Sequence, residues 1–593
     1  MRALLGRLKR LQLHLFPRAL PVALVLGTVL SLPSLGVGFF GDDYLHLAIL
    51  DGLPAPGTPF SLFTFASGDP AEMRRFLELG PYPWWTLPEV KLSFWRPLSS
   101  ALMVLDHTLF GRSPVPYHVH SILWHLLTIL VAAGVLRRLP GAAGGLALLF
   151  FVVDETHVFP VMWVANRNAL VATAPALFGL WMHLRWREQG WRPGLPLSLL
   201  GLAVGLLGGE TALGAFVYLG AYELLGNPGP KAARARALVP AFLLGLAYFL
   251  MYRALGHGAY GSGTYFDPVA DWQQYLPGLA TRIPALLAGL LWTLPPELWV
   301  LLPSLRPVQV LVGCFAIAMG VFLTAAVRRT LSADEWRHTR WLMAGGLLSL
   351  LPVAATFPAA RLLLMPSLGA SALLSVIALG VWRSLPGLRG WRRWTLSGLT
   401  AAMFSVQGLA TIFWGLYPYG LRAVGDASLE AIARIEVDDA RISRQRVVSL
   451  VVPDPLIGLY PAIIRATQGR PPARSWLPLS LAPYDHVLHR TSDAAFELSL
   501  AEGHFLTTEL EQLFRGPGFA MRVGDQVSVK GCRVTLLETD GSLPQRIRFE
   551  FDMSLDDPDL VLLTQQEGTL RRLQPPPVGE TVRLTWVQLV VGR

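Results

Sequence analysis

The sequence predicts a polytopic α-helical membrane protein that ends in a soluble domain of mixed α/β, β-rich structure. Of its 593 residues 52% are hydrophobic and only 15% are charged, whereas a soluble protein has roughly a quarter charged residues. Apolar stretches of about twenty residues recur between Leu20 and Trp414, and each can cross a hydrocarbon core of roughly 30 Å. Beyond about Gly425 charged residues return. We therefore predict a membrane domain over 1–420 and a soluble domain over 425–593.

The net charge of +10 does not indicate nucleic-acid binding. Lys and Arg lie in short clusters between apolar stretches, as the positive-inside rule expects of a protein whose surroundings are membrane lipids. The two cysteines, Cys314 and Cys532, fall in different regions. The soluble domain is therefore expected to have no internal disulfide.

The first apolar stretch predicts an uncleaved helix. It runs from Leu20 to Phe40 after a basic segment, which resembles the start of a signal peptide. It is long, however, and lacks a clear small-residue cleavage site. We expect the N-terminus to be cytoplasmic.

Basic clusters mark the expected cytoplasmic ends of the later spans. They are the N-terminal segment, Arg137-Arg138, Arg185 to Arg187, Lys231 to Arg236, Arg328-Arg329 with Arg337 and Arg340, and Arg383 to Arg393. The chain must cross an even number of times between clusters, which predicts about eleven spans. These are 19–40, 117–136, 142–153, 168–184, 194–209, 211–227, 236–254, 298–326, 340–357, 363–382 and 394–415.

The apolar stretch 276–294 does not fit this parity as a span. Pro284, Pro295 and Pro296 interrupt it, so we interpret it as a re-entrant or interfacial segment. An odd number of crossings then places residues 425–593 outside a bacterial-type cytoplasmic membrane. The long segment 41–116 becomes the first outer loop.

The soluble domain shows a short helical stretch and several strand patterns. The helix is expected near 426–437, and the strands at Val447 to Val452, Met521 to Val529, Val534 to Leu537, Arg546 to Met553 and Val582 to Val591. No metal-binding or nucleotide-binding motif accompanies them.

Unusual polar residues gather in the segments that this topology places outside. Each has a structural explanation, because acids after helices are often solvated caps and arginines can extend to lipid phosphates. His118 and His125 likewise fit helix packing. Ionisable residues at membrane depth usually mark function, however, and several loops deliver them to one side. The candidates are Asp42, Asp43, Trp95, Arg96, Asp154, Glu155, His157, Trp163, Arg167, Glu210 and Arg361.

Several of these segments together resemble a family. They are Trp95-Arg96-Pro97-Leu98, Leu105 to Gly111 with Pro116 to His125, His157 to Arg167, Gly209-Glu210 and Arg361 to Gly369. In order and spacing they are similar to the protein O-mannosyltransferase-like branch of the GT-C membrane glycosyltransferases, which includes the transmembrane and tetratricopeptide-repeat O-mannosyltransferases. The resemblance covers most of 20–420 and implies a GT-C-like membrane domain.

The sequence departs from that branch at three points. Asp154-Glu155 stands where the branch has His-Pro, and Leu364 replaces a Tyr before Pro-Ser. The β-rich domain takes the place of the tetratricopeptide repeats. These departures leave the sugar and the acceptor open.

The resemblance implies inverting transfer of a sugar from a polyprenyl-phosphate donor to an acceptor hydroxyl on the outer face. Asp42 is then the expected general base, with Asp43 orienting it or binding the acceptor. Arginine matches a phosphate leaving group, so the donor phosphate is expected to bind Arg361 and Arg167, with Arg96 third. The residues expected to bind sugar or acceptor are Asp154, Glu155, His157, Trp95, Trp163 and Glu210. No metal or other cofactor is expected, although the oxygen ligands would suit a divalent cation.

Two other classes of function remain open on the sequence. A transporter or flippase for a lipid-linked glycan would also hold intramembrane charges, but it predicts inverted repeats, which are not evident. A non-catalytic envelope assembly protein would keep the fold and present the C-terminal domain to a partner. The Asp42-Asp43 pair favours an enzyme.

Overall fold

The computed structural model describes residues 18–588 and divides the chain into two compact units. The helical unit comprises the chain up to Gly38, Trp95–Gly256 and Pro268–Gly420. The sheet unit comprises Phe39–Phe94, His257–Asp267 and the chain from Leu421 onward. Most of the predicted first outer loop thus belongs with the C-terminal region.

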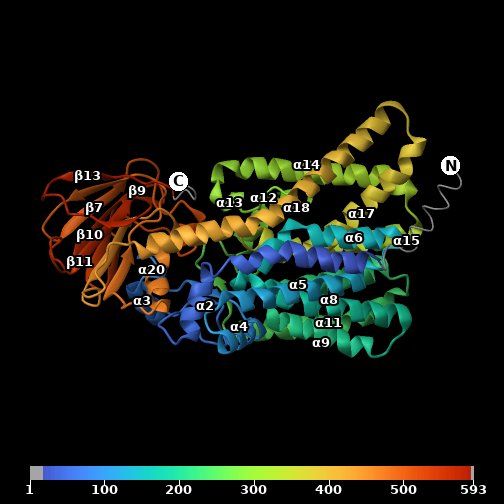
Figure 1. The fold of residues 1–593 in the computed structure, drawn as a ribbon, viewed down its shortest axis with the longest axis horizontal. Helices are drawn as coiled ribbons and strands as arrows, with labels where there is room; N and C mark the ends of the chain where they lie inside the picture. Colours follow the sequence, from blue (N-terminus) through green and yellow to red (C-terminus); the bar gives the residue numbers. More distant parts are fainter. Residues whose placement is uncertain (1–17, 589–593) are drawn as a thin grey trace. The chain divides into compact units, whose positions relative to one another are not determined.

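The helical unit consists of helices that pack around an apolar core, and Figure 1 shows α5, α8, α9 and α11 running side by side. Its main helices after the first span are α4 (Pro97–Phe110), α5 (Pro114–Leu136), α6 (Ala142–Val153), α7 (Val158–Met162), α8 (Asn168–Gln189), α9 (Gly194–Gly208), α10 (Leu213–Ala221), α11 (Lys231–Ala254), α12 (Trp272–Trp292), α13 (Leu298–Leu301), α14 (Arg306–Val327), α15 (Ala333–Leu348), α16 (Leu350–Val353), α17 (Pro366–Ser384) and α18 (Gly390–Ala433). Short 3-10 turns and one π-helical turn, η5 (Tyr222–Gly226), join or extend them.

Six helices in the described residues are long and apolar enough to span a membrane, or seven if one bent pair counts as a span. They are Arg18–Gly36, Pro114–Leu136, Lys231–Ala254, Pro303–Thr330, Pro366–Gly387 and Gly390–Ala433, and the bent pair is Ala142–Val153 with Glu155–Met162. These helices support the predicted membrane class. The count of about eleven stays a prediction, because elements such as the 15-residue α9 are too short to reach the usual span length alone.

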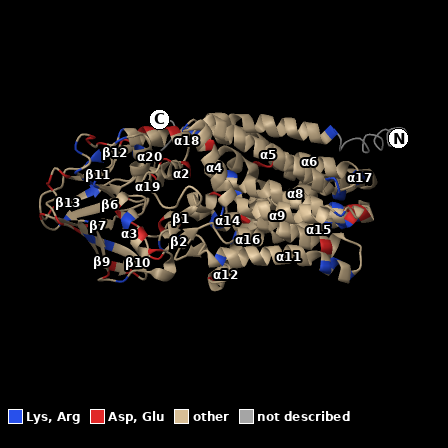
Figure 2. Cartoon of the chain, turned by 90° about the horizontal axis from the view of Figure 1, so that it is seen from below, with Lys and Arg blue, Asp and Glu red and all other residues tan. Residues whose placement is uncertain are grey.

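The predicted cytoplasmic basic clusters between Arg137 and Arg393 lie at one end of the helical unit, whereas the N-terminal basic segment lies outside the described residues. Arg138 pairs with Glu188 at 3.1 Å, beside the Arg185 to Arg187 cluster, and Arg383 pairs with Glu335 at 2.9 Å. Figure 2 shows Lys and Arg gathered near α15 and α17, with little charge along the helices. Which side of a membrane this end faces stays a prediction.

Two boundaries predicted from proline and glycine are wrong. Pro284 lies inside the continuous helix α12 rather than breaking it, and Gly313 of α14 packs against the Pro284 backbone. The missing hydrogen bond at a proline can be tolerated where neighbouring helices support the backbone. In the same way, α18 continues through Pro418 and past 425, so the expected last span and the helix near 426–437 are one 44-residue helix.

The sheet unit contains three sheets. An antiparallel sheet has the order β1 (Thr64–Ser67), β2 (Lys91–Ser93) and β3 (Gly258–Tyr260). A six-stranded antiparallel sheet has the order β13 (Thr581–Leu584), β6 (His486–Arg490), β7 (Ala495–Leu500), β10 (Leu543–Phe551), β9 (Cys532–Asp540) and β8 (Gln526–Val529). The third sheet has the order β12 (Thr569–Arg572), β11 (Leu560–Gln566), β4 (Arg446–Val451) and β5 (Ser475–Pro478). In it the pairs β11–β4 and β4–β5 are parallel.

The predicted β-rich class is confirmed, and the strand predictions are confirmed in part. Strands β4, β9 and β10 overlap their expected positions, whereas β8 and β13 cover only part of the expected stretches. The last residues of the Val582 to Val591 prediction lie outside the described residues. Strands β5, β6, β7, β11 and β12 were missed.

Two adjacent tryptophans in the segment before β2 form hydrogen bonds with the C-terminal part of the sheet unit. Trp84 Nε1 donates to the Leu479 carbonyl at 2.9 Å, and Trp85 Nε1 donates to the Glu511 carbonyl at 3.1 Å. Both rings are almost fully buried. This segment is therefore part of the core of the sheet unit.

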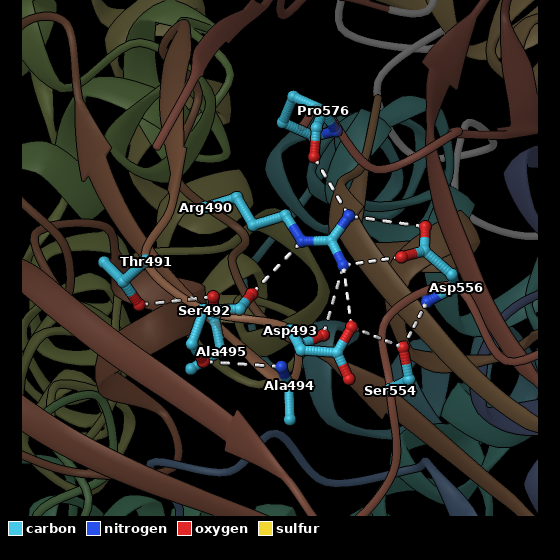
Figure 3. Close-up of polar contacts among 9 residues, drawn as sticks. All are labelled: Arg490, Thr491, Ser492, Asp493, Ala494, Ala495, Ser554, Asp556 and Pro576. Carbon is cyan, nitrogen blue, oxygen red and sulfur yellow. Dashed lines mark hydrogen bonds and ion pairs between the residues drawn. The ribbon is translucent and has the colours of Figure 1, made fainter. Parts of the chain in front are cut away.

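Arg490, at the end of β6, joins three loops of the sheet unit (Figure 3). Its guanidinium donates to the carbonyl oxygens of Ser492 at 3.1 Å and Pro576 at 3.1 Å. It also donates to Asp556 at 2.6 Å, which holds the pKa of that carboxyl below its usual range. The Arg490 side chain is only 5% exposed, so one buried cation satisfies several backbone acceptors.

Replacing Arg490 by alanine is expected to lower the free energy of unfolding by about 2–3 kcal/mol, because carbonyl oxygens lose their donor. The matched control is Arg533→Ala, since Arg533 forms an exposed pair with Glu550 at 4.0 Å and such pairs contribute under about 1 kcal/mol. Thermal unfolding of both full-length variants measures the difference. Equal melting temperatures would contradict the proposed role of Arg490.

Candidate functional site

The chain bends at Asp154, the first of the candidate acids in the helical unit. Helix α6 ends at Val153, and the next helical stretch, from Glu155 to Met162, departs from it by 49°. Asp154 Oδ1 accepts a hydrogen bond from the Thr156 N–H at 3.0 Å, so the carboxylate caps the 3-10 turn η2 (Glu155–His157). An acid that caps a helix start satisfies an otherwise unpaired N–H. The same bend presents Glu155 beside it.

The turn η2 packs against the turn η8 (Ala360–Leu362), which carries Arg361. The Arg361 guanidinium lies 5.4 Å from the centroid of the Trp163 ring and 5.6 Å from that of Phe357. Cations over aromatic rings at such distances are attracted by the ring quadrupole. The sequence prediction thus selected four residues that the fold brings to one region: Asp154, Glu155, Trp163 and Arg361.

Glu297 completes this region and was missed from the sequence. Its Oε1 accepts a hydrogen bond from the Ala360 N–H at 2.7 Å, next to Arg361. Burial raises the pKa of Glu297, while the Ala360 N–H and the Arg361 charge act in the opposite direction. Glu155 belongs to the turn η2, which packs against the turn η8 that carries Ala360. The sequence feature that could have indicated Glu297 is an acid directly after Pro295-Pro296 within an apolar stretch.

We call Asp154, Glu155, Trp163, Glu297 and Arg361 the arginine–acid cluster. It lies at the opposite end of the helical unit from the basic clusters. Helix α6 begins just after Arg137-Arg138 and ends next to Asp154, and α17 begins just after Arg361 and ends at the Arg383 cluster. In such a group the guanidinium can bind a phosphate, whereas carboxylates can accept hydrogen bonds from sugar hydroxyls.

Arg96 and Glu210 form a separate pair in the helical unit. Arg96 Nε lies 2.8 Å from Glu210 Oε2, and the Tyr252 hydroxyl donates to the other carboxylate oxygen at 3.3 Å. Gly209 has a φ of +154°, in a region that favours glycine. The Arg96 side chain packs against Gly209. The adjacent Trp95 packs against Tyr248, with ring centroids 5.8 Å apart. The charge of Arg96 is therefore balanced by Glu210, and Arg96 as a phosphate ligand stays a prediction.

Arg167 is also balanced by an acid. Its guanidinium lies 2.5 Å from Asp106, and both side chains are 2% exposed. It also donates to the Tyr117 carbonyl at 3.1 Å. This geometry fits a buried structural ion pair. Removing one partner of such a pair strongly destabilises the protein, because the other charge stays buried. Arg167 as a phosphate ligand stays a prediction.

His157 packs among aromatic side chains. Its Nε2 is hydrogen-bonded to Ser367 Oγ at 2.9 Å, and its ring contacts Phe151, with centroids 4.5 Å apart. His125 and Trp414 lie 5.7 Å and 6.0 Å away between ring centroids. The side chain is fully buried, so this arrangement favours helix packing over contact with a sugar.

Asp42 and Asp43 begin helix α2 (Asp42–Leu50) of the sheet unit. Asp43 is buried and accepts from the Phe40 N–H at 2.9 Å, which fixes the start of the helix. Asp42 Oδ1 accepts from the Tyr460 hydroxyl at 2.5 Å. Acids in a first turn are stabilised by the helix dipole. Both roles expected for Asp43, orienting Asp42 and binding the acceptor, stay predictions.

Within residues 18–588 no group of three or more His, Cys, Asp or Glu side chains is arranged to hold a metal ion. No protein-family model matches the sequence, and no curated protein is similar enough to be matched. The functional assignment therefore depends on the chemistry of the residues described above.

Proposed function

We propose that the protein is a membrane-embedded glycosyltransferase of the GT-C type, which moves a sugar from a polyprenyl-phosphate donor to an acceptor hydroxyl. The observation that carries the proposal is the arginine–acid cluster. It combines a cation held near two aromatic rings with three acids, at the end of the helical unit remote from the basic clusters. Ionisable groups at such helix ends in a membrane protein usually serve function.

In the proposed reaction each group has one role. Asp42 accepts the proton of the acceptor hydroxyl, and the acceptor oxygen forms a bond to the anomeric carbon. The bond between that carbon and the phosphate oxygen breaks, and its electron pair leaves with the polyprenyl phosphate. Arg361 binds the departing phosphate and neutralises its charge. Attack opposite the leaving group inverts the anomeric centre.

The proposal includes an orientation. The basic clusters at one end of the helical unit favour a cytoplasmic position for that end. The arginine–acid cluster would then be extracytoplasmic in a bacterial-type cytoplasmic membrane. The odd number of predicted crossings separately gives an extracytoplasmic C-terminal domain. Lipid-linked donors presented on that face would be the substrates.

Transfer by the purified protein tests the proposal. Full-length protein in lipid nanodiscs is incubated with polyprenyl-phosphate [³H]mannose, with water or a membrane extract as acceptor. We expect labelled sugar to leave the lipid as polyprenyl phosphate accumulates. Binding of the donor without turnover in any acceptor preparation would contradict the proposal, and would favour the alternatives of a flippase or a non-catalytic assembly protein.

A further inference from the structure

The C-terminal region supplies a direct partner to Asp42. Tyr460 lies between the short helices α19 (Pro455–Leu459) and α20 (Pro461–Thr467), and its hydroxyl donates to Asp42 Oδ1 at 2.5 Å. Helix α20 packs against α2. All of these residues belong to the sheet unit. Two segments separated by 418 positions are therefore joined at the proposed base.

Tyr460 remains a hydrogen-bond donor at ordinary pH. Burial, and then the charge of Asp42, raise the pKa of the Tyr460 hydroxyl well above its usual range. A phenol that stays protonated donates to a carboxylate and favours the ionised form of that carboxylate. It also limits the rotation of the carboxylate group.

We propose that Tyr460 is a positioning residue for Asp42, so that the C-terminal domain takes part in the reaction by orienting the general base and keeping it ionised. This inference rests on the proposed function. It assigns no new chemical step: the acceptor proton still passes to Asp42, and Tyr460 keeps its own proton throughout.

Other ionisable groups lie on α2 and on the segments around it. Asp43, Tyr44 and His46 lie on α2 itself, and Tyr82 lies before β2. Asp426 on α18 acts on Tyr44, and Arg465 on α20 is paired with Asp439. Asp43 is the nearest of them in sequence and carries a like charge, which opposes ionisation of Asp42. The Tyr460 hydroxyl acts in the opposite direction.

Tyr460→Phe removes only the hydroxyl and tests the inference. Loss of a hydrogen bond to the charged form raises the pKa of Asp42, so the acidic limb of the pH profile of kcat/KM should move up by about one pH unit. The ratio of variant to wild-type activity should therefore rise with pH. KM for polyprenyl-phosphate mannose should change less than kcat.

The matched control is Tyr484→Phe, because Tyr484 lies in the same unit and packs against Gly503. We expect the control to keep the wild-type pH profile. An activity ratio for Tyr460→Phe that is independent of pH, including a ratio of one, would overturn the inference. The variant Asp42→Asn distinguishes failure of the positioning role from failure of the proposed function. If Asp42→Asn is inactive while Tyr460→Phe keeps the wild-type pH profile, only the positioning role of Tyr460 fails. If Asp42→Asn is active, the proposed role of Asp42 as the base fails.

Discussion

Replacing Asp42 by asparagine is expected to lower kcat at least about 100-fold, because an amide cannot accept the acceptor proton and general bases contribute roughly 10²–10⁴-fold. The substitution is nearly isosteric. The amide oxygen can still accept the hydrogen bond that Tyr460 donates to Oδ1, so the local structure should remain. The rate of labelled mannose transfer measures the effect, and donor affinity should stay within about twofold.

The control for this variant is Asp51→Asn. Asp51 is the C-cap residue of the same helix, α2, so the substitution removes the same charge at the other end of the element. It should keep nearly full activity. Transfer by Asp42→Asn at close to the wild-type rate would show that another group is the base.

Replacing Arg361 by alanine should weaken binding of the polyprenyl-phosphate donor by about 30-fold or more. Removing one partner of a desolvated charged contact costs about 2–5 kcal/mol, and each 1.4 kcal/mol is a factor of about ten in affinity. Titration of the nanodisc-embedded protein with the labelled donor gives Kd. Arg361→Lys should fall between wild type and alanine, because lysine keeps the charge but not the planar fork.

The matched control is Arg185→Ala. Arg185 also lies over an indole ring, 4.1 Å from the centroid of Trp191, but it belongs to the basic end of the helical unit. Loss of a cation–aromatic contact alone should therefore leave Kd unchanged. If Arg361→Ala binds the donor as tightly as the control, Arg361 does not bind the phosphate.

Hydropathy and charge were sufficient to predict the membrane class and the β-rich C-terminal region. They could not place the ends of α18, because the glycines and Pro418 that indicate a break also occur inside membrane helices. The stretch that forms β11 is a short apolar run with no marked alternation, and runs of that kind do not distinguish a strand from a helix.

The candidate site was predictable where an acid or arginine interrupts an apolar sequence. Arg361 and Glu155 both satisfy that criterion. Glu297 satisfies it too, but it directly follows Pro295-Pro296 and was therefore not selected as a candidate. Whether an arginine is already balanced depends on tertiary contacts, as the pair between Arg167 and Asp106 shows. The partner of Asp42 could not be found from sequence, because no local pattern connects Tyr460 with a residue so far away.

The composition of the sheet unit has a consequence for biosynthesis. Residues 39–94 emerge from the ribosome long before residues 421–588, yet Trp84 and Trp85 find their hydrogen-bond acceptors only at Leu479 and Glu511. Contacts that remote in sequence form late and leave apolar surface uncovered in the meantime. During synthesis, residues 39–94 therefore cannot form these two indole hydrogen bonds until the last third of the chain has been made. A chain truncated near 425 would keep its membrane helices but expose this loop to aggregation and proteolysis.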